Sequence, residues 1–263
     1  MKPGNSEPRV VGMIQSRMGS SRLPGKALLE IGGCPLVARI CRRVALAETV
    51  TESVVVTTEA AGEAPMLQQL DRMGIGAFQG STDDLVVRFH DAALRFNADV
   101  IVRIWGDCPF VDPAVIDMAV RRLRDDGLDY CATFSPTRRT FPGGLDLEVY
   151  RVTTLERIRT ESDDPFYREF PADYLQANTS SFAVGSVEAD ADYSKFNLTI
   201  DYPEDLELAR AIYDRLEHGK DMAAAADFHP IVDLLEQEPV LLALDQGQAR
   251  NAEYLSKLEE MGE

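Results

Sequence analysis

Residues 9–26 read RVVGMIQSRMGSSRLPGK and join a β-branched apolar run, Arg9–Ile14, to a loop rich in glycine and serine. The apolar run is typical of a buried strand. Small residues in the loop allow backbone N–H groups to turn toward an anion, while Arg17, Arg22 and Lys26 add positive charge. The segment therefore predicts a phosphate-binding turn in an α/β fold. The alternative is a basic loop that is only solvated.

The loop does not match the common phosphate-binding motifs. A Walker A loop has four residues between its glycines and a Ser or Thr after its lysine. Here Gly19 and Gly25 enclose five residues, and Ala27 follows Lys26. The spacing is not GxGxxG either. A triphosphate requires several donors, several cations and no nearby carboxylate, which is what the loop offers.

The basic loop lies in an acidic chain of 263 residues with a formal net charge of −17. Such a charge repels nucleic acid and anionic membranes, so neither is an expected partner. The start, MKPGNSEPR, lacks the apolar run of a signal peptide, and no segment approaches the roughly 18 apolar residues of a membrane span. The four cysteines lack paired metal-ligand spacing. These features predict a cytoplasmic protein with reduced thiols.

Apolar β-branched runs alternate with amphipathic stretches as far as residue 124. Strands are predicted over Arg9–Ile14, Ser53–Thr58, Gly74–Gln79 and Ala98–Trp105, and helices over Pro35–Ala47, Glu63–Met73, Asp84–Phe96 and Pro113–Arg124. Strict alternation implies a mainly parallel sheet with helices on both faces, a Rossmann-like α/β fold. Ligands bind at the carboxyl ends of such strands, so the loops after Ile14 and Trp105 are the expected site.

The pattern changes from Tyr130 onward. Residues 129–134, 145–150 and 180–187 predict antiparallel strands, with helices over Val152–Thr160 and Phe166–Ala177, a further strand at Leu198–Asp201 and a helix from Pro203 to Leu216. We interpret residues 130–194 as a small antiparallel insertion in a domain of residues 9–216. The composition of residues 217–263 predicts a helical C-terminal extension.

Five segments in order resemble the cytidylyltransferases that make CMP-activated sugars, especially the spore-coat polysaccharide biosynthesis branch. They are MIQSRMGSSRLPGKALLEIGGCPLV (13–37), GSTDDL (80–85), VRIWGDCPFVDP (102–113), GLDLEV (144–149) and LTIDYPEDL (198–206). The resemblance implies a Rossmann-like nucleotide-diphospho-sugar transferase fold. It also implies transfer of CMP from CTP to a sugar, sugar acid or sugar-like phosphate, with release of pyrophosphate, for surface polysaccharide or glycoconjugate biosynthesis.

Two aspartates follow predicted strands and suit Mg²⁺, which prefers oxygen ligands. The resemblance implies that Asp107 holds the metal on the α-phosphate and that Asp201 is the second carboxylate. The alternative for Asp107 is a helix cap, but Asp112 fits that role better. Asp201 has the same alternative before the helix at Pro203, and Asp205 is expected in the first turn of that helix.

Nucleotide binding is assigned to the first loop and to two later turns. The residues are Gln15, Ser16, Arg17, Gly19, Ser20, Arg22, Lys26, Asp83, Asp84 and Gly106. Arg17 and Lys26 join Asp107 as the catalytic residues. Capping of the helix that runs to Phe96 explains one of Asp83 and Asp84, so the roles of this pair stay open.

The predicted acceptor side contains Asp146, Glu148, Arg168 and Lys195. Asp146 and Glu148 alternate on one strand and should face the same side. In the resemblance this strand borders the acceptor site. Phe170 replaces a polar residue usual in the family, and Lys195 stands where an arginine is often found. Lys and Arg are not equivalent donors, so these departures concern the acceptor more than the reaction.

Three other functions fit parts of the pattern. The same chemistry with GTP and a sugar or polyol phosphate is the nearest alternative. A glycosyltransferase usually carries an Asp-x-Asp metal motif, and Asp107-Cys108-Pro109 is not one. A non-catalytic nucleotide-binding regulator would not need the intact loop and both aspartates. The resemblance also suggests a homodimer, whereas the acceptor itself is not fixed by the sequence.

Overall fold

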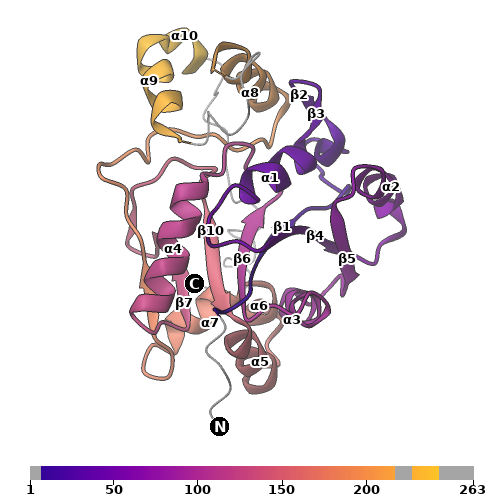
Figure 1. Cartoon of the computed structure of the whole chain (residues 1–263), viewed down its shortest axis with the longest axis vertical. Helices are drawn as coiled ribbons and strands as arrows, with labels where there is room; N and C mark the ends of the chain where they lie inside the picture. Colours follow the sequence, from indigo (N-terminus) through magenta and orange to yellow (C-terminus); the bar gives the residue numbers. More distant parts are fainter. Residues whose placement is uncertain (1–6, 217–226, 243–263) are drawn as a thin grey trace.

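The computed structural model describes residues 7–216 and 227–242. Within these residues the core is a seven-stranded sheet of order β11-β7-β10-β6-β1-β4-β5 (Figure 1). Its strands are β1 (Val10–Gln15), β4 (Glu52–Thr58), β5 (Gly76–Gly80), β6 (Val100–Trp105), β7 (Tyr130–Ala132), β10 (Leu147–Arg151) and β11 (Val184–Ser186). Two short hairpins lie outside this sheet, β2 (Glu30–Ile31) with β3 (Cys34–Pro35) and β8 (Phe134–Ser135) with β9 (Arg138–Arg139).

Helices cover both faces of the sheet, which confirms the predicted fold class. They are α1 (Leu36–Val44), α2 (Ala64–Arg72), α3 (Leu85–Arg95), α4 (Pro113–Asp125), α5 (Val152–Glu161), α6 (Pro165–Glu169), α7 (Pro171–Ala177), α8 (Pro203–Leu216), α9 (His229–Gln237) and α10 (Pro239–Leu242), with short 3₁₀ turns η1 (Lys26–Leu28) and η2 (Ala61–Glu63). Helices α1 and α4 pack on one face, and α3 and α5 pack on the other. Helices α8, α9 and α10 gather at the top of the view in Figure 1.

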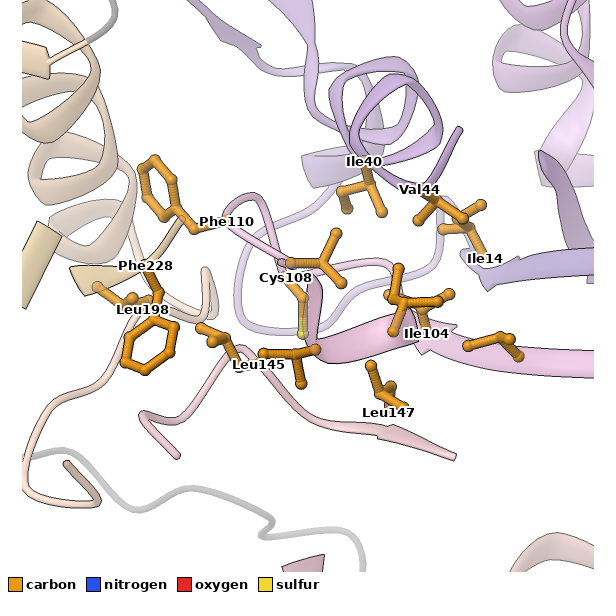
Figure 2. Close-up of a cluster of buried hydrophobic side chains, with 14 of the residues drawn as sticks. Ile14, Ile40, Val44, Ile104, Cys108, Phe110, Leu145, Leu147, Leu198 and Phe228 are labelled. Carbon is orange, nitrogen blue, oxygen red and sulfur yellow. The ribbon is translucent and has the colours of Figure 1, made fainter. Parts of the chain in front are cut away.

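Strand alternation divides the core into two apolar layers. In β1, Val10 and Ile14 join the layer under α1, whereas Val11 and Met13 join the layer under α3. Figure 2 shows the first layer, in which Ile14 lies beneath α1. Side chains alternate because successive residues of a strand point to opposite faces. Burial on both faces therefore requires the nearly continuous apolar run that β1 has.

The central strands are parallel, and this arrangement positions the site. Strand β1 pairs in parallel with β4 and β6, and β4 pairs in parallel with β5. Gln15, the last residue of β1, lies beside Trp105, the last residue of β6. The loops that leave these two strands consequently meet at the carboxyl edge of the sheet, as the alternation of elements predicts.

Three predictions in the second half of the chain need correction. Strand β11 pairs with β7 in parallel, although β10 is antiparallel to both β6 and β7 as expected. Leu198–Asp201 forms no strand, because the N–H groups of Leu198 and Ile200 bond single carbonyls of two loops, those of Gly143 and Asp107. The helix predicted over Phe166–Ala177 is two helices, since Pro171 has no N–H to continue the first one.

Residues 227–242, the described part of the predicted C-terminal extension, contain α9 and α10 and pack against the core. Phe228 N donates to the Asp112 carboxylate at 3.0 Å, and the Phe228 ring packs edge-on against Phe141. The rest of the predicted extension, residues 217–226 and 243–263, lies outside the described residues. None of the described helices has the length and apolarity that a bilayer crossing needs.

Candidate active site

The basic loop after β1 is closed by its own backbone. Gly25 N donates to Met18 O at 3.2 Å, and Gly25 has a φ of 72°, a left-handed conformation that favours glycine. The buried carboxylate of Glu63 accepts from Met18 N at 3.0 Å and from Thr57 Oγ1 at 3.0 Å. Glu63 could not be predicted as a loop contact, because nothing in its local sequence indicates a partner 45 residues away.

Lys26 links three segments that are far apart in the sequence. Its Nζ donates to Asp107 Oδ2 at 3.1 Å, to Asp201 Oδ1 at 3.0 Å and to the carbonyl of Ile200 at 2.9 Å. Burial lowers the pKa of Lys26, but the charges of Asp107 and Asp201 outweigh this effect and the pKa is raised. The lysine is therefore a fixed positive charge between the two carboxylates.

Arg22 extends this cationic contact to the outer edge of the loop. Its Nη2 donates to Asp201 Oδ1 at 2.7 Å, and its guanidinium lies 5.5 Å from the ring centroid of Tyr202. Arg17 is exposed in the same loop, and Ser20 Oγ accepts from the loop N–H of Leu23. Two of the three predicted phosphate-binding cations thus contact an aspartate predicted to hold metal.

Asp107 owes its position to the glycine before it. Gly106 N donates to Gln15 O at 2.8 Å, and a Cβ at Gly106 would meet Gln15 O at 2.7 Å and Ser16 Cβ at 2.8 Å. Only glycine allows the two loops to approach this closely. The adjacent Cys108 is buried, and burial together with the charge of Asp107 raises its pKa well above the usual value. Cys108 is consequently a neutral thiol.

Three further carboxylates, those of Asp112, Asp84 and Asp205, accept hydrogen bonds from backbone N–H groups at the start of a helix. Asp112 accepts from the first N–H groups of α4, and Asp84 accepts from Val87 N at 2.8 Å at the start of α3. Asp205 accepts from the N–H groups of Asp201 and Tyr202, at 2.8 and 2.9 Å. Asp205 therefore orients the backbone on which Asp201 is carried. The cap predicted for one of the pair 83–84 is confirmed at Asp84, and Asp83 is exposed.

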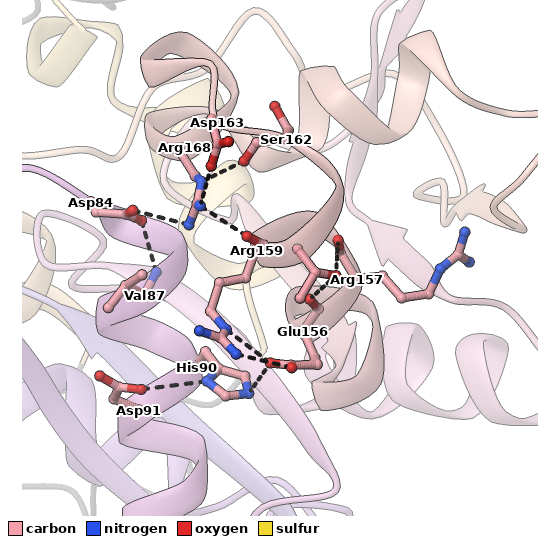
Figure 3. A network of polar contacts seen from close by, with 11 residues as sticks. Asp84, Val87, His90, Asp91, Glu156, Arg157, Arg159, Ser162, Asp163 and Arg168 are labelled. Atoms are coloured by element: carbon pink, nitrogen blue, oxygen red, sulfur yellow. Dashed lines mark hydrogen bonds and ion pairs between the residues drawn. The ribbon is translucent and has the colours of Figure 1, made fainter.

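Arg168 joins Asp84 in the polar network drawn in Figure 3. Its Nη1 donates to Asp84 Oδ2 at 3.0 Å, and its other nitrogens reach the carbonyls of Ser162 at 2.7 Å and Arg159 at 2.9 Å. The structure thus places Arg168 at the junction of α3, α5 and α6. It is not among the residues that line the cavity described below.

A buried polar chain runs from the nucleotide loop across the sheet. Arg103 Nε donates to Gln15 Oε1 at 2.8 Å, and its Nη1 donates to Glu148 Oε2 at 2.6 Å. Tyr130 OH donates to the other Glu148 oxygen at 3.0 Å. The Arg103 guanidinium also lies 4.7 Å from the ring centroid of Trp105. Gln15 and Glu148, predicted on opposite sides of the site, are therefore connected through Arg103.

A cavity of about 880 Å³ opens beside this chain and extends to Asp107 and Asp201. Pockets of about 300–1,000 Å³ are typical of small-molecule sites. Glu148 lies in its lining, and so does Asp146, as the strand alternation predicts. Lys195 lines the cavity as well and donates to Glu236 on α9 at 3.0 Å.

Arg139 is a cavity residue that sequence analysis missed. It lies in β9 and forms an ion pair with Asp146, whose pKa is raised by burial and lowered less strongly by the Arg139 charge. The signal available in the sequence was only a pair of arginines, Arg138 and Arg139, between two turn-like segments. Because side chains alternate along β9, the Arg139 side chain lines the cavity. Arg138 does not line the cavity and pairs with Glu188 instead.

Comparison with known proteins agrees with this geometry. Residues 11–242 match a family model described as cytidylyltransferase. The chain belongs to the cytidylyltransferase family. The spore coat polysaccharide biosynthesis protein SpsF of Bacillus subtilis is 29% identical, with 88% of this chain and 95% of that protein aligned. The structure of a cytidylyltransferase from Leptospira borgpetersenii matches with a TM-score of 0.81 and 29% identity, covering 93% of this chain and 99% of that one.

Another relative has a named acceptor. The 3-deoxy-manno-octulosonate cytidylyltransferase of Geobacter sulfurreducens is 32% identical over 61% of this chain and 65% of its own length. This cytidylyltransferase is accordingly an enzyme of the nucleotidyltransferase class that transfers CMP from CTP. Membership decides against the glycosyltransferase and the non-catalytic alternatives, and it favours CTP over GTP as the donor.

Proposed function

We propose that this cytidylyltransferase joins CMP to an oxygen of a sugar, sugar acid or sugar-like phosphate and releases pyrophosphate, for surface polysaccharide or glycoconjugate biosynthesis. The contact of Lys26 with both Asp107 and Asp201 carries the proposal. It joins the basic loop to the mouth of the cavity, so that a triphosphate on the loop presents its α-phosphorus to an acceptor in the cavity. The spore-coat relative supports a role in surface polysaccharide biosynthesis. The use of CTP, a cytoplasmic nucleotide, supports a cytoplasmic location.

The donor set at this point fits Mg²⁺. Three oxygens, from Asp107, Asp201 and the Ile200 carbonyl, surround the Lys26 ammonium, which stands in for a cation. Oxygen ligands are those that Mg²⁺ prefers, and the ion usually takes only one or two carboxylates and completes its shell with water and phosphate oxygens. In the described residues no group of three or more His, Cys, Asp and Glu side chains is placed to hold a metal ion.

Asp107 and Asp201 would hold the ion, and the ion would neutralise charge on the transferred phosphate. The loop residues have separate tasks. Lys26 and Arg17 neutralise the triphosphate, while Gln15, Ser16, Gly19, Ser20 and Gly106 bring backbone and side-chain donors to it. Arg22 moves from Asp201 to the leaving pyrophosphate. Catalysis by positioning and charge neutralisation is general for phosphoryl-type transfer.

Two further assignments concern the base and the acceptor. Asp83 and Asp84 lie in the turn after β5, at the carboxyl edge where the nucleoside would extend. Asp146, Glu148 and Lys195 line the cavity and contact the acceptor, and Arg168 supports that side by holding α6. A homodimer, suggested by the family resemblance, completes the proposal.

Thermal unfolding with each nucleoside triphosphate, with and without Mg²⁺, tests the donor and the ion together. A ligand at about 100 times its dissociation constant adds about 2.7 kcal/mol of stability. We expect a Mg²⁺-dependent increase in Tm with CTP and little change with GTP, ATP or UTP. Pyrophosphate release in the presence of candidate acceptors then tests the transfer. Equal shifts with all four nucleotides, or a shift with none, would contradict the proposed donor.

A further inference from the structure

The cations that line the acceptor cavity are already neutralised within the protein. In residues 7–216 and 227–242 the lining contains three of them, Arg103, Arg139 and Lys195. Arg103 pairs with Glu148 at 2.6 Å, Arg139 pairs with Asp146, and Lys195 pairs with Glu236 at 3.0 Å. The partners of Arg103 and Arg139 line the cavity themselves. An entering carboxylate would therefore meet a cation only together with the carboxylate that already binds it.

Burial makes the Arg103–Glu148 pair hard to exchange. The side chains of Arg103 and Glu148 are 8% and 3% exposed, whereas those of Arg139 and Asp146 are 35% and 18% exposed and Lys195 at the rim is 66% exposed. Displacing one member of a buried pair leaves its partner charged and unpaired, which is strongly unfavourable. Asp107 and Asp201 also line the cavity, and Lys26 pairs with both of them. The lining is thus neutral to negative wherever an acceptor ring would lie.

The remaining lining suits an uncharged ring with hydroxyl groups. Aromatic side chains of Trp105, Phe134, Phe170 and Phe196 provide apolar surface for the C–H faces of such a ring. Asn197 also lines the cavity, and its buried Nδ2 has no hydrogen-bond partner in the described structure. A buried donor without a partner is rare and costly, so a ligand oxygen is a fitting acceptor for it.

We propose that the part of the acceptor that occupies this cavity is a neutral, polyhydroxylated ring without a carboxylate, selected by the Arg103–Glu148 and Arg139–Asp146 pairs. The proposal rests on the proposed transfer of CMP and narrows its acceptor class. It separates this chain from its relative named for 3-deoxy-manno-octulosonate, which is a sugar acid.

Matched pairs of sugars test the class directly. The full chain, with Mg²⁺ and a non-hydrolysable CTP analogue, is offered hexoses and N-acetylhexosamines beside their uronic acids, and also 3-deoxy-manno-octulosonate. Ligand-observed saturation-transfer NMR measures binding, and pyrophosphate release with CTP measures turnover. We expect neutral members to bind and their acids to be at least about tenfold weaker. An acid that binds as well as its neutral match overturns the proposal, as does a panel in which no neutral ring binds.

A charge variant then tests the mechanism of selection. Asp146→Asn keeps the side-chain shape but leaves Arg139 without its carboxylate, so uronic acids should gain at least about tenfold in affinity relative to neutral rings. Glu188→Gln is the matched control, because it removes the partner of Arg138 outside the cavity lining and should change neither ligand class. An unchanged acid-to-neutral ratio in a folded Asp146→Asn protein contradicts the role of the pair.

The same samples distinguish this inference from the function on which it rests. Stabilisation by Mg²⁺ and CTP is measured for the wild type and each variant before any sugar is added. Loss of that effect in the wild type contradicts CMP transfer itself. A normal CTP effect together with selection of acids contradicts only the neutral-acceptor inference.

Discussion

At the scale of single residues, Asp107 lies where the basic loop, the end of β6 and the segment before α8 meet. Its carboxylate is 23% exposed and contacts Lys26 Nζ, so it is held without being sealed from ligand. We expect Asp107→Asn to fold normally and to reduce kcat by more than about 100-fold. A residue that only supports a metal ligand usually costs about 10- to 100-fold when it is replaced. Circular dichroism and pyrophosphate release measure the two effects.

The control for that variant is Asp125→Asn, at the exposed end of α4, where only a long contact of 3.6 Å with Arg124 is lost. It should retain full activity. Wild-type turnover by Asp107→Asn would remove the proposed role of this carboxylate.

Gly106 is the residue on which the approach of the two loops depends. A Cβ there would lie 2.7 Å from Gln15 O, which is backbone and cannot rotate away. We expect Gly106→Ala to lower the free energy of unfolding by about 1–3 kcal/mol, as overpacking does. The affinity for CTP should fall as well, because Gln15 and Ser16 shift. Chemical denaturation and nucleotide titration measure these changes, and Gly62→Ala is the control, since a Cβ there meets nothing within 4 Å.

At the scale of elements, Arg168 holds the carboxyl end of α5 against the start of α3 (Figure 3). Its fork reaches two carbonyls and the Asp84 carboxylate at once, which a lysine cannot do. Arg168→Lys should therefore lower the free energy of unfolding by about 1–3 kcal/mol, the cost of unpaired buried groups. Arg121→Lys, which alters an exposed pair with Glu48, should change it by less than 1 kcal/mol. Equal Tm values for the two variants would contradict this role of Arg168.

The elements that could be predicted from sequence are those that local pattern specifies. The β-branched run of β1 predicts a strand from its own residues. The aspartates before α3 and α4 likewise predict where these two helices begin. Leu198–Asp201 has the same apolar character, but its partners are single carbonyls of distant loops. Pairing of Arg139 with Asp146, and of Glu63 with Met18, likewise depends on tertiary approach. Local periodicity carries no information about such contacts.

Helix α9 is tied to the segment that lines the cavity through a titratable contact. His229 bonds Asp227 at 2.6 Å and Asp190 at 3.2 Å, and its ring packs against Tyr193. Burial lowers the pKa of His229, but these two carboxylates outweigh it and the pKa is raised above 6.5. Because the pKa of His229 is higher in the folded than in the unfolded protein, the contact stabilises the fold fully at pH values below the unfolded-state pKa. This stabilisation is lost as the pH rises through the folded-state pKa.

Stability should therefore decrease through the range just above pH 6.5 in the wild type and less so in His229→Gln. The difference between the two proteins should be about 0.5 kcal/mol larger at about pH 5.5 than at about pH 8.5, because the pair is partly exposed and screened. Tm measured across this range checks the sign. A difference that grows with pH would contradict the arrangement.

At the scale of the whole molecule, an acidic body carries a small cationic site. The described structure neutralises that site internally, since Lys26 and Arg22 bind the carboxylates that we propose for the metal. Nucleotide and ion therefore have to arrive together: the triphosphate takes the cations, and the ion takes the carboxylates. This exchange explains why the donor test compares CTP with and without Mg²⁺ rather than either ligand alone.

The net charge of −17 makes its own prediction for stability. Like charges repel in the compact state, and salt screens them because the Debye length falls from about 30 Å at 0.01 M to about 10 Å at 0.1 M. Exposed ion pairs such as Arg121–Glu48 weaken with salt too, but they contribute little. Tm should therefore rise by a few degrees as NaCl increases over that range at neutral pH. The rise should shrink near pH 5, close to the pI of about 4.6, where the net charge is small. A fall in Tm with salt at neutral pH would show that paired charges outweigh the repulsion.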